Sequence, residues 1–147
     1  MLIQPLMALD YGSHRTGVAI SDELAFFAHP RSALNGSGKK LLSQIEELIS
    51  SENISEVVVG LPLTLAGGDS EQTKLTRRWI AHLRVILDIP IIEWDERLTS
   101  IQADKILDAS GHSRKNRRTG IRDSAAATII LQAVLDSRRL KSNNPNE

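Results

Sequence analysis

The chain has 147 residues, enough for one domain of ordinary size that buries an apolar core without disulfides or a structural metal. It contains no cysteine, which excludes a disulfide framework, a thiolate metal site and a cysteine nucleophile. Its 18 basic residues balance 18 acidic ones, which argues against coating of nucleic acid by bulk charge but leaves room for a local basic patch. Every apolar run is far below the roughly 18 residues of a membrane span, so we expect a soluble, cytoplasmic protein that binds no membrane.

The first predicted strand is an apolar run, Leu6–Leu9, that ends in a single carboxylate, Asp10. Gly12 and Gly17 would let the chain turn sharply into a second strand. An ionised carboxylate at the edge of a core costs several kcal/mol unless a metal ion, a basic side chain or backbone N–H groups pair with it. The function of this strand end therefore depends on which of these groups pairs with the Asp10 carboxylate.

The next segments predict the rest of an antiparallel meander and then a helix. A strand is expected over about 15–21, and an edge strand over 26–34, where Pro30 interrupts the pattern. The apolar residues of 39–50 then fall on one face at a spacing of 3.6 residues, which is typical of an amphipathic helix.

The following segments alternate between strand and helix. The run 57–61 predicts a strand buried on both faces, and 89–96 predicts a fifth strand. Between them, Asp69 with Gln72 resembles the capping box of a helix that continues to Ile86. Alternation of this kind implies parallel strands, so we expect an α/β fold with a mixed five-stranded sheet, an antiparallel meander plus two parallel strands, and helices on both faces.

Two further helices are predicted towards the C-terminus. Thr99 and Gln102 repeat the capping-box spacing and open a helix that stops at Gly111, and Asp123 opens the last helix. No linker or repeat is visible, so we expect a single domain over 1–140 followed by a polar tail over 141–147.

A basic loop is expected directly before the last helix, since 111–122 contains no acidic residue. It could clamp phosphates, or its charges could simply be solvated. Arg15 is a further phosphate candidate, with a structural role as the alternative. The candidate nucleic-acid-binding residues are Arg15, Arg114, Lys115, Arg117, Arg118 and Arg122. Because the chain has only five aromatic residues, backbone charge and shape would dominate binding.

Three predicted elements end or begin with acids: Asp10, the pair Asp95 and Glu96, and Asp123. If their ends meet at one edge of the sheet, the acids converge, and such a cluster needs a raised pKa or a divalent cation. Hard oxygen ligands favour Mg²⁺ or Mn²⁺, and two ions roughly 3.5–4 Å apart suit phosphodiester cleavage. The plainer interpretations are a turn ligand for Asp10, a helix cap for Asp123 and pairing of the other two with Arg97. Alternation admits only one of Asp95 and Glu96 to the cluster and does not choose between them.

Four blocks of the sequence resemble the YqgF (RuvX) family, in the family's order and over nearly the whole chain. The blocks are Leu9–Gly12 with Arg15–Asp22, then Val59–Pro62, then Asp95–Ser100 with Ala103, and finally Asp123–Ala126. Ser13 and His14 stand where Thr-Lys is expected in many members, which bears on substrate contacts rather than on metal binding.

The resemblance implies a ribonuclease H-like fold related to Holliday-junction resolvases. The family is generally described as a candidate nuclease that trims the 5′ end of precursor small-subunit ribosomal RNA, with resolvase activity also proposed. For this chain the resemblance implies a metal-dependent phosphodiesterase that uses Asp10, Glu96 and Asp123 as catalytic residues and metal ligands. It favours Glu96 over Asp95 as the ligand at the end of the fifth predicted strand.

Three other functions remain open at this point. The first is Holliday junction resolution on DNA, which needs paired active sites, whereas an RNA-trimming enzyme works as a monomer; we expect a monomer or a weak homodimer. The second is a non-catalytic RNA-binding factor in ribosome assembly or transcription. The third is phosphoryl transfer from ATP, because the turn after Asp10 also resembles the first phosphate loop of sugar kinases, although 147 residues do not supply their second lobe.

Overall fold

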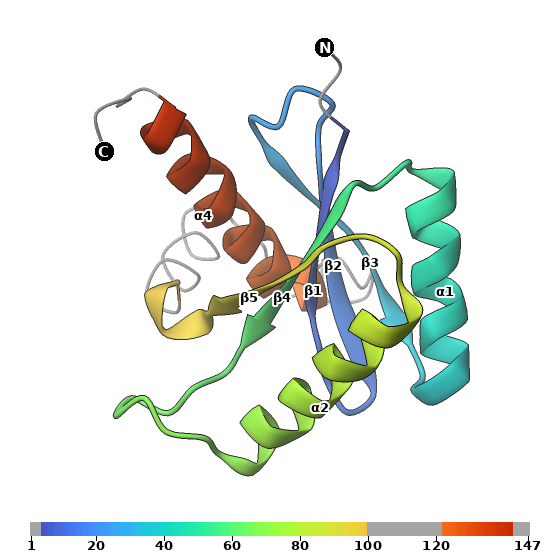
Figure 1. The fold of residues 1–147 in the computed structure, drawn as a ribbon, viewed down its shortest axis with the longest axis vertical. Coiled ribbons are helices and arrows are strands. Elements are labelled where there is room, and N and C mark those ends of the chain that lie inside the picture. Colours follow the sequence, from blue (N-terminus) through green and yellow to red (C-terminus); the bar gives the residue numbers. More distant parts are fainter. Residues whose placement is uncertain (1–3, 100–121, 143–147) are drawn as a thin grey trace.

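The computed structural model describes residues 4–99 and 122–142, and within them a single mixed sheet forms the centre of the molecule (Figure 1). The strands lie in the order β3-β2-β1-β4-β5. They are β1 (Leu6–Asp10), β2 (Arg15–Ser21), β3 (Ala28–Asn35), β4 (Glu56–Leu61) and β5 (Ile91–Asp95). The helices are α1 (Gly38–Ser51), α2 (Glu71–Ile86) and α4 (Ala125–Ser142), with 3₁₀ turns η1 (Glu96–Leu98) and η3 (Arg122–Ser124).

The sheet confirms the predicted mixture of antiparallel and parallel pairs. β1 pairs antiparallel with β2, with Asp10 opposite Gly17, and β2 pairs antiparallel with β3. β1, β4 and β5 run parallel, with α2 connecting β4 to β5. Pro30 is tolerated because β3 is an edge strand. The C-terminal ends of β1, β4 and β5 therefore lie at one edge of the sheet.

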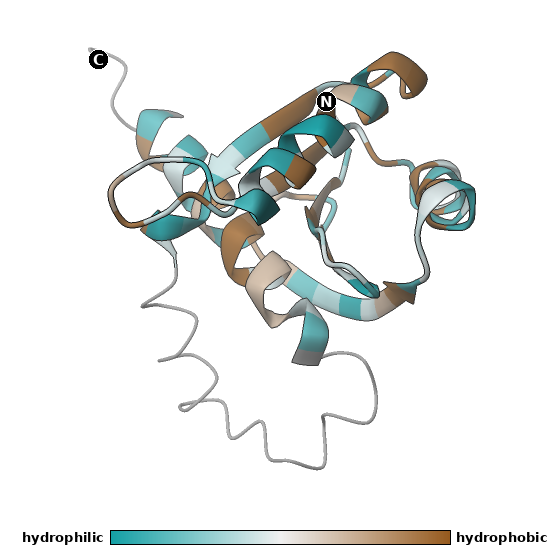
Figure 2. Ribbon diagram, turned by 90° about the horizontal axis from the view of Figure 1, so that it is seen from below, coloured by the Kyte–Doolittle hydropathy of each residue, from teal (hydrophilic) through white to brown (hydrophobic). Residues whose placement is uncertain are grey.

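Helices cover both faces of the sheet, as predicted (Figure 1). Met7 and Leu9 of β1 face a core shared with α1 and α2, whereas Leu6 and Ala8 face a core shared with α4. This alternation explains why β1 is apolar throughout, since both of its faces are buried. The helix ribbons carry hydrophobic and hydrophilic residues alternately, as amphipathic helices do (Figure 2).

The structure corrects the predicted start of α2. Ser70, not Asp69, is the N-cap: its hydroxyl accepts from the Thr73 N–H at 3.2 Å, and the Thr73 hydroxyl accepts from the Ser70 N–H at 3.1 Å. Asp69 instead pairs with Arg77 at 2.9 Å. The pair of Ser70 and Thr73 satisfies unpaired N–H groups at the start of the helix in the way predicted for Asp69 and Gln72, but one residue later.

Element boundaries differ from the predicted ones at three other places. β3 begins at Ala28 rather than 26, because the Asp22 carboxylate accepts from the N–H groups of Phe26 and Phe27 and holds them in a turn. β5 is shorter than 89–96 and leaves Glu96 in η1. α4 continues to 142, past the start of the predicted tail at 141.

The predicted helix from Thr99 to Gly111 lies largely outside the described residues, and so does most of the basic loop. In the described parts of the chain, no helix combines the length and apolar character needed to cross a membrane.

Candidate functional site

Asp10 is the last residue of β1 and lies on the α4 side of the sheet, the side of Leu6 and Ala8. The loop that follows is fastened to α2. The ring of Tyr11 stacks on that of Trp79 with centroids 4.2 Å apart and planes 11° apart, and the Gln72 amide donates to the Tyr11 carbonyl at 3.4 Å. The loop therefore leaves Asp10 at the sheet edge instead of carrying it into solvent.

Glu96 reaches the same place from β5, because Gly60 of β4 leaves room for it. A Cβ atom on Gly60 would lie 2.9 Å from the Glu96 Cγ and 2.6 Å from the Ile130 Cδ1. Any larger residue at position 60 would displace the Glu96 side chain or the α4 residue that packs beside it. Gly60 thus allows Glu96 to cross β4 towards Asp10.

The carboxyl groups of Asp10 and Glu96 are hydrogen-bonded to each other. Burial raises the pKa of Asp10 above its usual value, against the opposing effect of that hydrogen bond. Burial, followed by the negative charge of Asp10, raises the pKa of Glu96 to about 8. The two carboxyl groups consequently keep a shared proton between them at neutral pH.

Asp95 takes a different role. Its carboxylate accepts from the Arg97 guanidinium at 2.6 Å and from the Arg97 backbone N–H at 3.0 Å, which caps η1. These hydrogen bonds hold the pKa of Asp95 below its usual value. The two neighbouring acids thus differ in their contacts: Glu96 faces Asp10, whereas Asp95 pairs with Arg97.

Asp123 is placed through its backbone, which lies directly over β2. A Cβ atom on Gly17 would stand 2.4 Å from the Asp123 carbonyl oxygen, so only glycine permits this approach. The next residue, Ser124, is buried; its hydroxyl accepts from the Val18 N–H at 2.9 Å and donates to the Arg31 carbonyl at 2.6 Å. Gly17 thus serves close packing inside β2 rather than the turn that the sequence analysis proposed.

The structure brings Asp10 and Glu96 together but pairs the Asp123 carboxylate with Arg15, whose Nη1 lies 2.6 Å from the Asp123 Oδ2. Among residues 4–99 and 122–142, no three acidic or histidine side chains form a group that could hold a metal ion. Arg122 is the first residue of η3. The other predicted basic residues, Arg114, Lys115, Arg117 and Arg118, lie outside the described residues.

The chemistry of the donor set nevertheless fits a hard divalent cation. Asp10 and Glu96 are carboxylates whose mutual repulsion now requires a shared proton, and a cation between them would replace that proton. The backbone of Asp123 lies on the same face of the sheet as Asp10, because it packs against Gly17, the residue opposite Asp10 in the sheet. The Asp123 side chain is 41% exposed and is held by the ion pair with Arg15.

Three residues that support the site escaped the sequence analysis: Gly60, Gly17 in its packing role, and Ser124. Glycine inside a strand is a known signal of close backbone approach, so the first two were detectable. Ser124 gave no such signal, because its partners lie on β2 and β3, more than 90 residues away along the chain.

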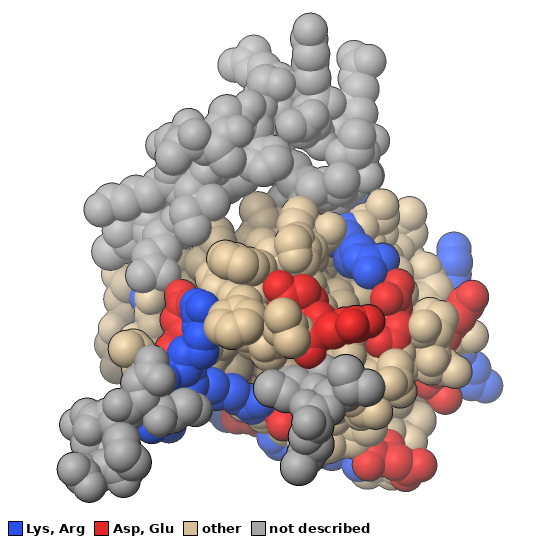
Figure 3. Space-filling view, turned by 90° about the horizontal axis from the view of Figure 1, so that it is seen from above, with Lys and Arg blue, Asp and Glu red and all other residues tan. Residues whose placement is uncertain are grey.

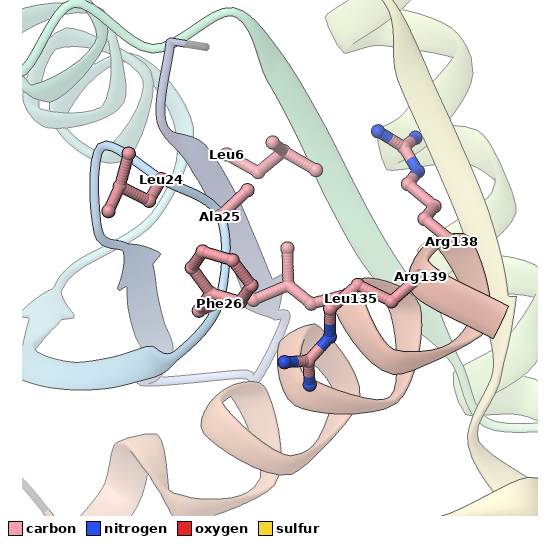
Figure 4. Close-up of a pocket in the computed structure, with 7 residues that line it drawn as sticks. All are labelled: Leu6, Leu24, Ala25, Phe26, Leu135, Arg138 and Arg139. Atoms are coloured by element: carbon pink, nitrogen blue, oxygen red, sulfur yellow. The ribbon is translucent and has the colours of Figure 1, made fainter. Parts of the chain in front are cut away.

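A cavity of about 340 Å³ lies at the other end of β1 (Figure 4). It lies between the β2–β3 hairpin and α4 and is lined by Leu6, Leu24, Ala25, Phe26, Leu135, Arg138 and Arg139. The Arg139 guanidinium covers the Phe26 ring at 5.4 Å. Seen from this end, the surface carries interspersed acidic and basic side chains (Figure 3). The carboxylates of the candidate site do not line this cavity.

The strand order and the helices on both faces define the ribonuclease H-like fold. Two solved structures share the fold: RuvC from T. thermophilus bound to a Holliday junction, and the fowlpox virus resolvase bound to junction DNA. The TM-scores are 0.53 and 0.57, over 92% and 94% of this chain and 96% and 99% of the respective neighbours. Sequence identities of 14% and 12% limit this likeness to the fold.

The family is defined more closely by sequence. The model of the RuvX family, described as Holliday junction resolvase, matches residues 4–137. Relatives from Koribacter versatilis and Desulforudis audaxviator, each named as a candidate pre-16S rRNA nuclease, are 38% and 40% identical. These alignments cover 95% and 94% of this chain and 92% and 98% of the relatives. The chain belongs to the RuvX family.

Proposed function

We propose that this protein is a metal-dependent nuclease for structured nucleic acid and that it processes the 5′ end of pre-16S rRNA during ribosome biogenesis. Membership of the RuvX family and the names of its relatives support a hydrolase that acts on phosphodiester bonds. The observation that carries the proposal is the half-buried, hydrogen-bonded pair of Asp10 and Glu96. Two carboxyls kept together in this way, at the end of parallel strands, are typical of a cation site.

Asp10, Glu96 and Asp123 would hold the cation, Mg²⁺ or Mn²⁺, and we propose two ions. Such ions, when bound, stabilise both the attacking water and the leaving oxygen of a phosphodiester. Glu96 would give up the proton that it shares with Asp10, so that both carboxylates could hold the cation. Asp95 is the weaker candidate, because its carboxylate is committed to Arg97.

The nucleic acid would be held through its phosphates. Arg15 opens β2 beside Asp123, and the cations at 114, 115, 117, 118 and 122 precede Asp123 along the chain. Arginine suits this role because its planar fork matches phosphate oxygens. We propose that these residues position the scissile phosphate without reading sequence.

The test is cleavage of an RNA carrying the 5′ precursor end of 16S rRNA, with Mg²⁺ or Mn²⁺, by Asp10→Asn, Glu96→Gln and Asp123→Asn. Loss of several kcal/mol of charge stabilisation should lower the rate at least about a hundredfold. Asp88→Asn, on the exposed turn after α2, is the matched control and should cleave normally. Undiminished cleavage by Asp10→Asn, or without divalent ions, would refute the proposal.

The second candidate is Holliday junction resolution, which the description of the matching family favours. A resolvase needs two active sites on one junction, and so a dimer at working concentration. Parallel assays on a four-way DNA junction and on the precursor RNA, with the mass measured in solution, would separate the two substrates. Paired symmetric cuts by a dimer would favour the junction.

A further inference from the structure

The ion pair between Arg15 and Asp123 joins a candidate phosphate-binding residue to a candidate metal ligand. The Arg15 Nη1 donates to the Asp123 Oδ2 at 2.6 Å across 108 residues of sequence. One carboxylate oxygen therefore lies against a fixed positive charge, which a divalent cation would have to replace. The guanidinium and the cation compete for the same oxygen atoms.

Only the side chains can take part in an exchange, because the backbone at this position is held firmly. Gly17 packs against the Asp123 carbonyl oxygen, and the buried Ser124 hydroxyl bonds both β2 and β3. The two charged side chains, by contrast, are 58% and 41% exposed. An ion pair so exposed is weak, worth about a factor of five or less in an equilibrium constant, so it can open readily.

We propose that Arg15 is a phosphate-responsive positioning residue: it holds the Asp123 carboxylate until a nucleic-acid phosphate takes over its guanidinium, which frees Asp123 for the cation. This inference rests on the proposed function. A phosphate offers the guanidinium two oxygens and more negative charge than one carboxylate oxygen, so the exchange is favourable when nucleic acid is present. Nucleic acid and divalent cation then bind cooperatively, and by linkage each raises the affinity for the other.

The first experiment measures Mn²⁺ binding to the full chain by titration calorimetry, without nucleic acid. Arg15→Gln removes the competing charge, so Mn²⁺ should bind more tightly than to the unmodified chain, by a factor of up to about five. Arg31→Gln is the matched control: it makes the same charge change in another exposed pair, with Glu52 at 3.0 Å, and should change Mn²⁺ affinity little.

A double variant tests whether the effect passes through Asp123. When Asp123→Asn is already present, adding Arg15→Gln should no longer tighten Mn²⁺ binding. A merely structural role for Arg15 predicts the opposite pattern, in which its loss weakens Mn²⁺ binding or leaves it unchanged. Equal affinity of Arg15→Gln and the unmodified chain would overturn the proposal.

The third arm adds a duplex RNA as the source of phosphate. The RNA should tighten Mn²⁺ binding to the unmodified chain severalfold and have a clearly smaller effect on Arg15→Gln. The same tightening in both proteins would overturn the proposal while leaving the nuclease function intact. Absence of Mn²⁺ binding in every protein, with and without RNA, would instead refute the metal site and the inference together.

Discussion

Glu96 has a strongly raised pKa, and the surroundings of its carboxyl group explain why. It leaves β5 into η1, crosses over Gly60 and meets Asp10, where burial and a like charge both penalise its ionised form. The resulting pKa of about 8 means that the folded protein binds a proton that an ordinary glutamate releases near pH 4.5. Protonation of Glu96 therefore stabilises the metal-free fold.

This linkage predicts a pH-dependent effect of Glu96→Gln. The stabilisation due to the raised pKa is fully present below about pH 4.5 and is lost as pH rises through about 8. In EDTA, the variant should therefore melt close to the unmodified chain at pH 4.5 and about 5 °C higher at pH 9. Thermal unfolding followed by circular dichroism checks this, with the exposed Glu47→Gln as control; a difference that does not grow with pH would contradict it.

A second prediction for a single residue concerns Gly60. Gly60→Ala would force the new methyl group against Ile130 and Glu96, so overpacking should cost about 2 kcal/mol of unfolding free energy in urea. Gly68→Ala is the control, because its methyl group meets Thr64 only at an ordinary 3.4 Å. Equal stability of the two variants would show that Glu96 does not need the space at position 60.

At the scale of elements, the attachment of α4 decides where Asp123 stands. The β2–β3 ladder shifts register between Thr16 and Val18, and the Ser124 hydroxyl bonds the Val18 N–H and the Arg31 carbonyl at that irregularity. A side chain thus completes the hydrogen bonding of two strands and fixes the start of the helix on the sheet.

Ser124→Ala should consequently weaken both the fold and the site. One buried and one partly buried backbone group would lose their partner, which costs about 1–3 kcal/mol in urea unfolding. Thr128→Ala is the matched control, since that hydroxyl bonds only the Ser124 carbonyl one turn back in α4. If Ser124→Ala unfolds at the same urea concentration as Thr128→Ala, the anchor is unimportant.

The elements themselves were largely predictable from periodicity, and the errors have local causes. Apolar runs identified β1 and β4, because both faces of these strands are buried. The start of α2 was misassigned by one residue, because Asp69 and Ser70 are both good caps and only the tertiary pairing of Asp69 with Arg77 separates them. Glu96 could be preferred to Asp95 only through the family resemblance, since the chain leaves strand geometry at that residue.

At the scale of the whole molecule, the sheet order follows from the alternation of strands and helices, and it brings the ends of β1, β4 and β5 to one edge. The meeting of Asp10 and Glu96 follows from this order, because both residues lie at the ends of these strands. Sequence could not predict that Asp123 pairs with Arg15, because that contact depends on two exposed side chains brought together by the fold. The positions of Asp10 and Glu96 thus follow from the strand order of the sheet, whereas the pKa of Glu96 and the ion pair of Asp123 depend on contacts between side chains.

We propose that Asp10 and Glu96 hold a divalent cation in place of their shared proton. Calorimetric titration with Mg²⁺ or Mn²⁺, repeated in buffers of different ionisation enthalpy, tests this most directly. At pH 7, a Glu96 pKa of about 8 predicts release of close to one proton per first ion bound. Glu96→Gln should release almost none. Binding without proton release, or no binding that depends on Asp10 and Glu96, would contradict the account.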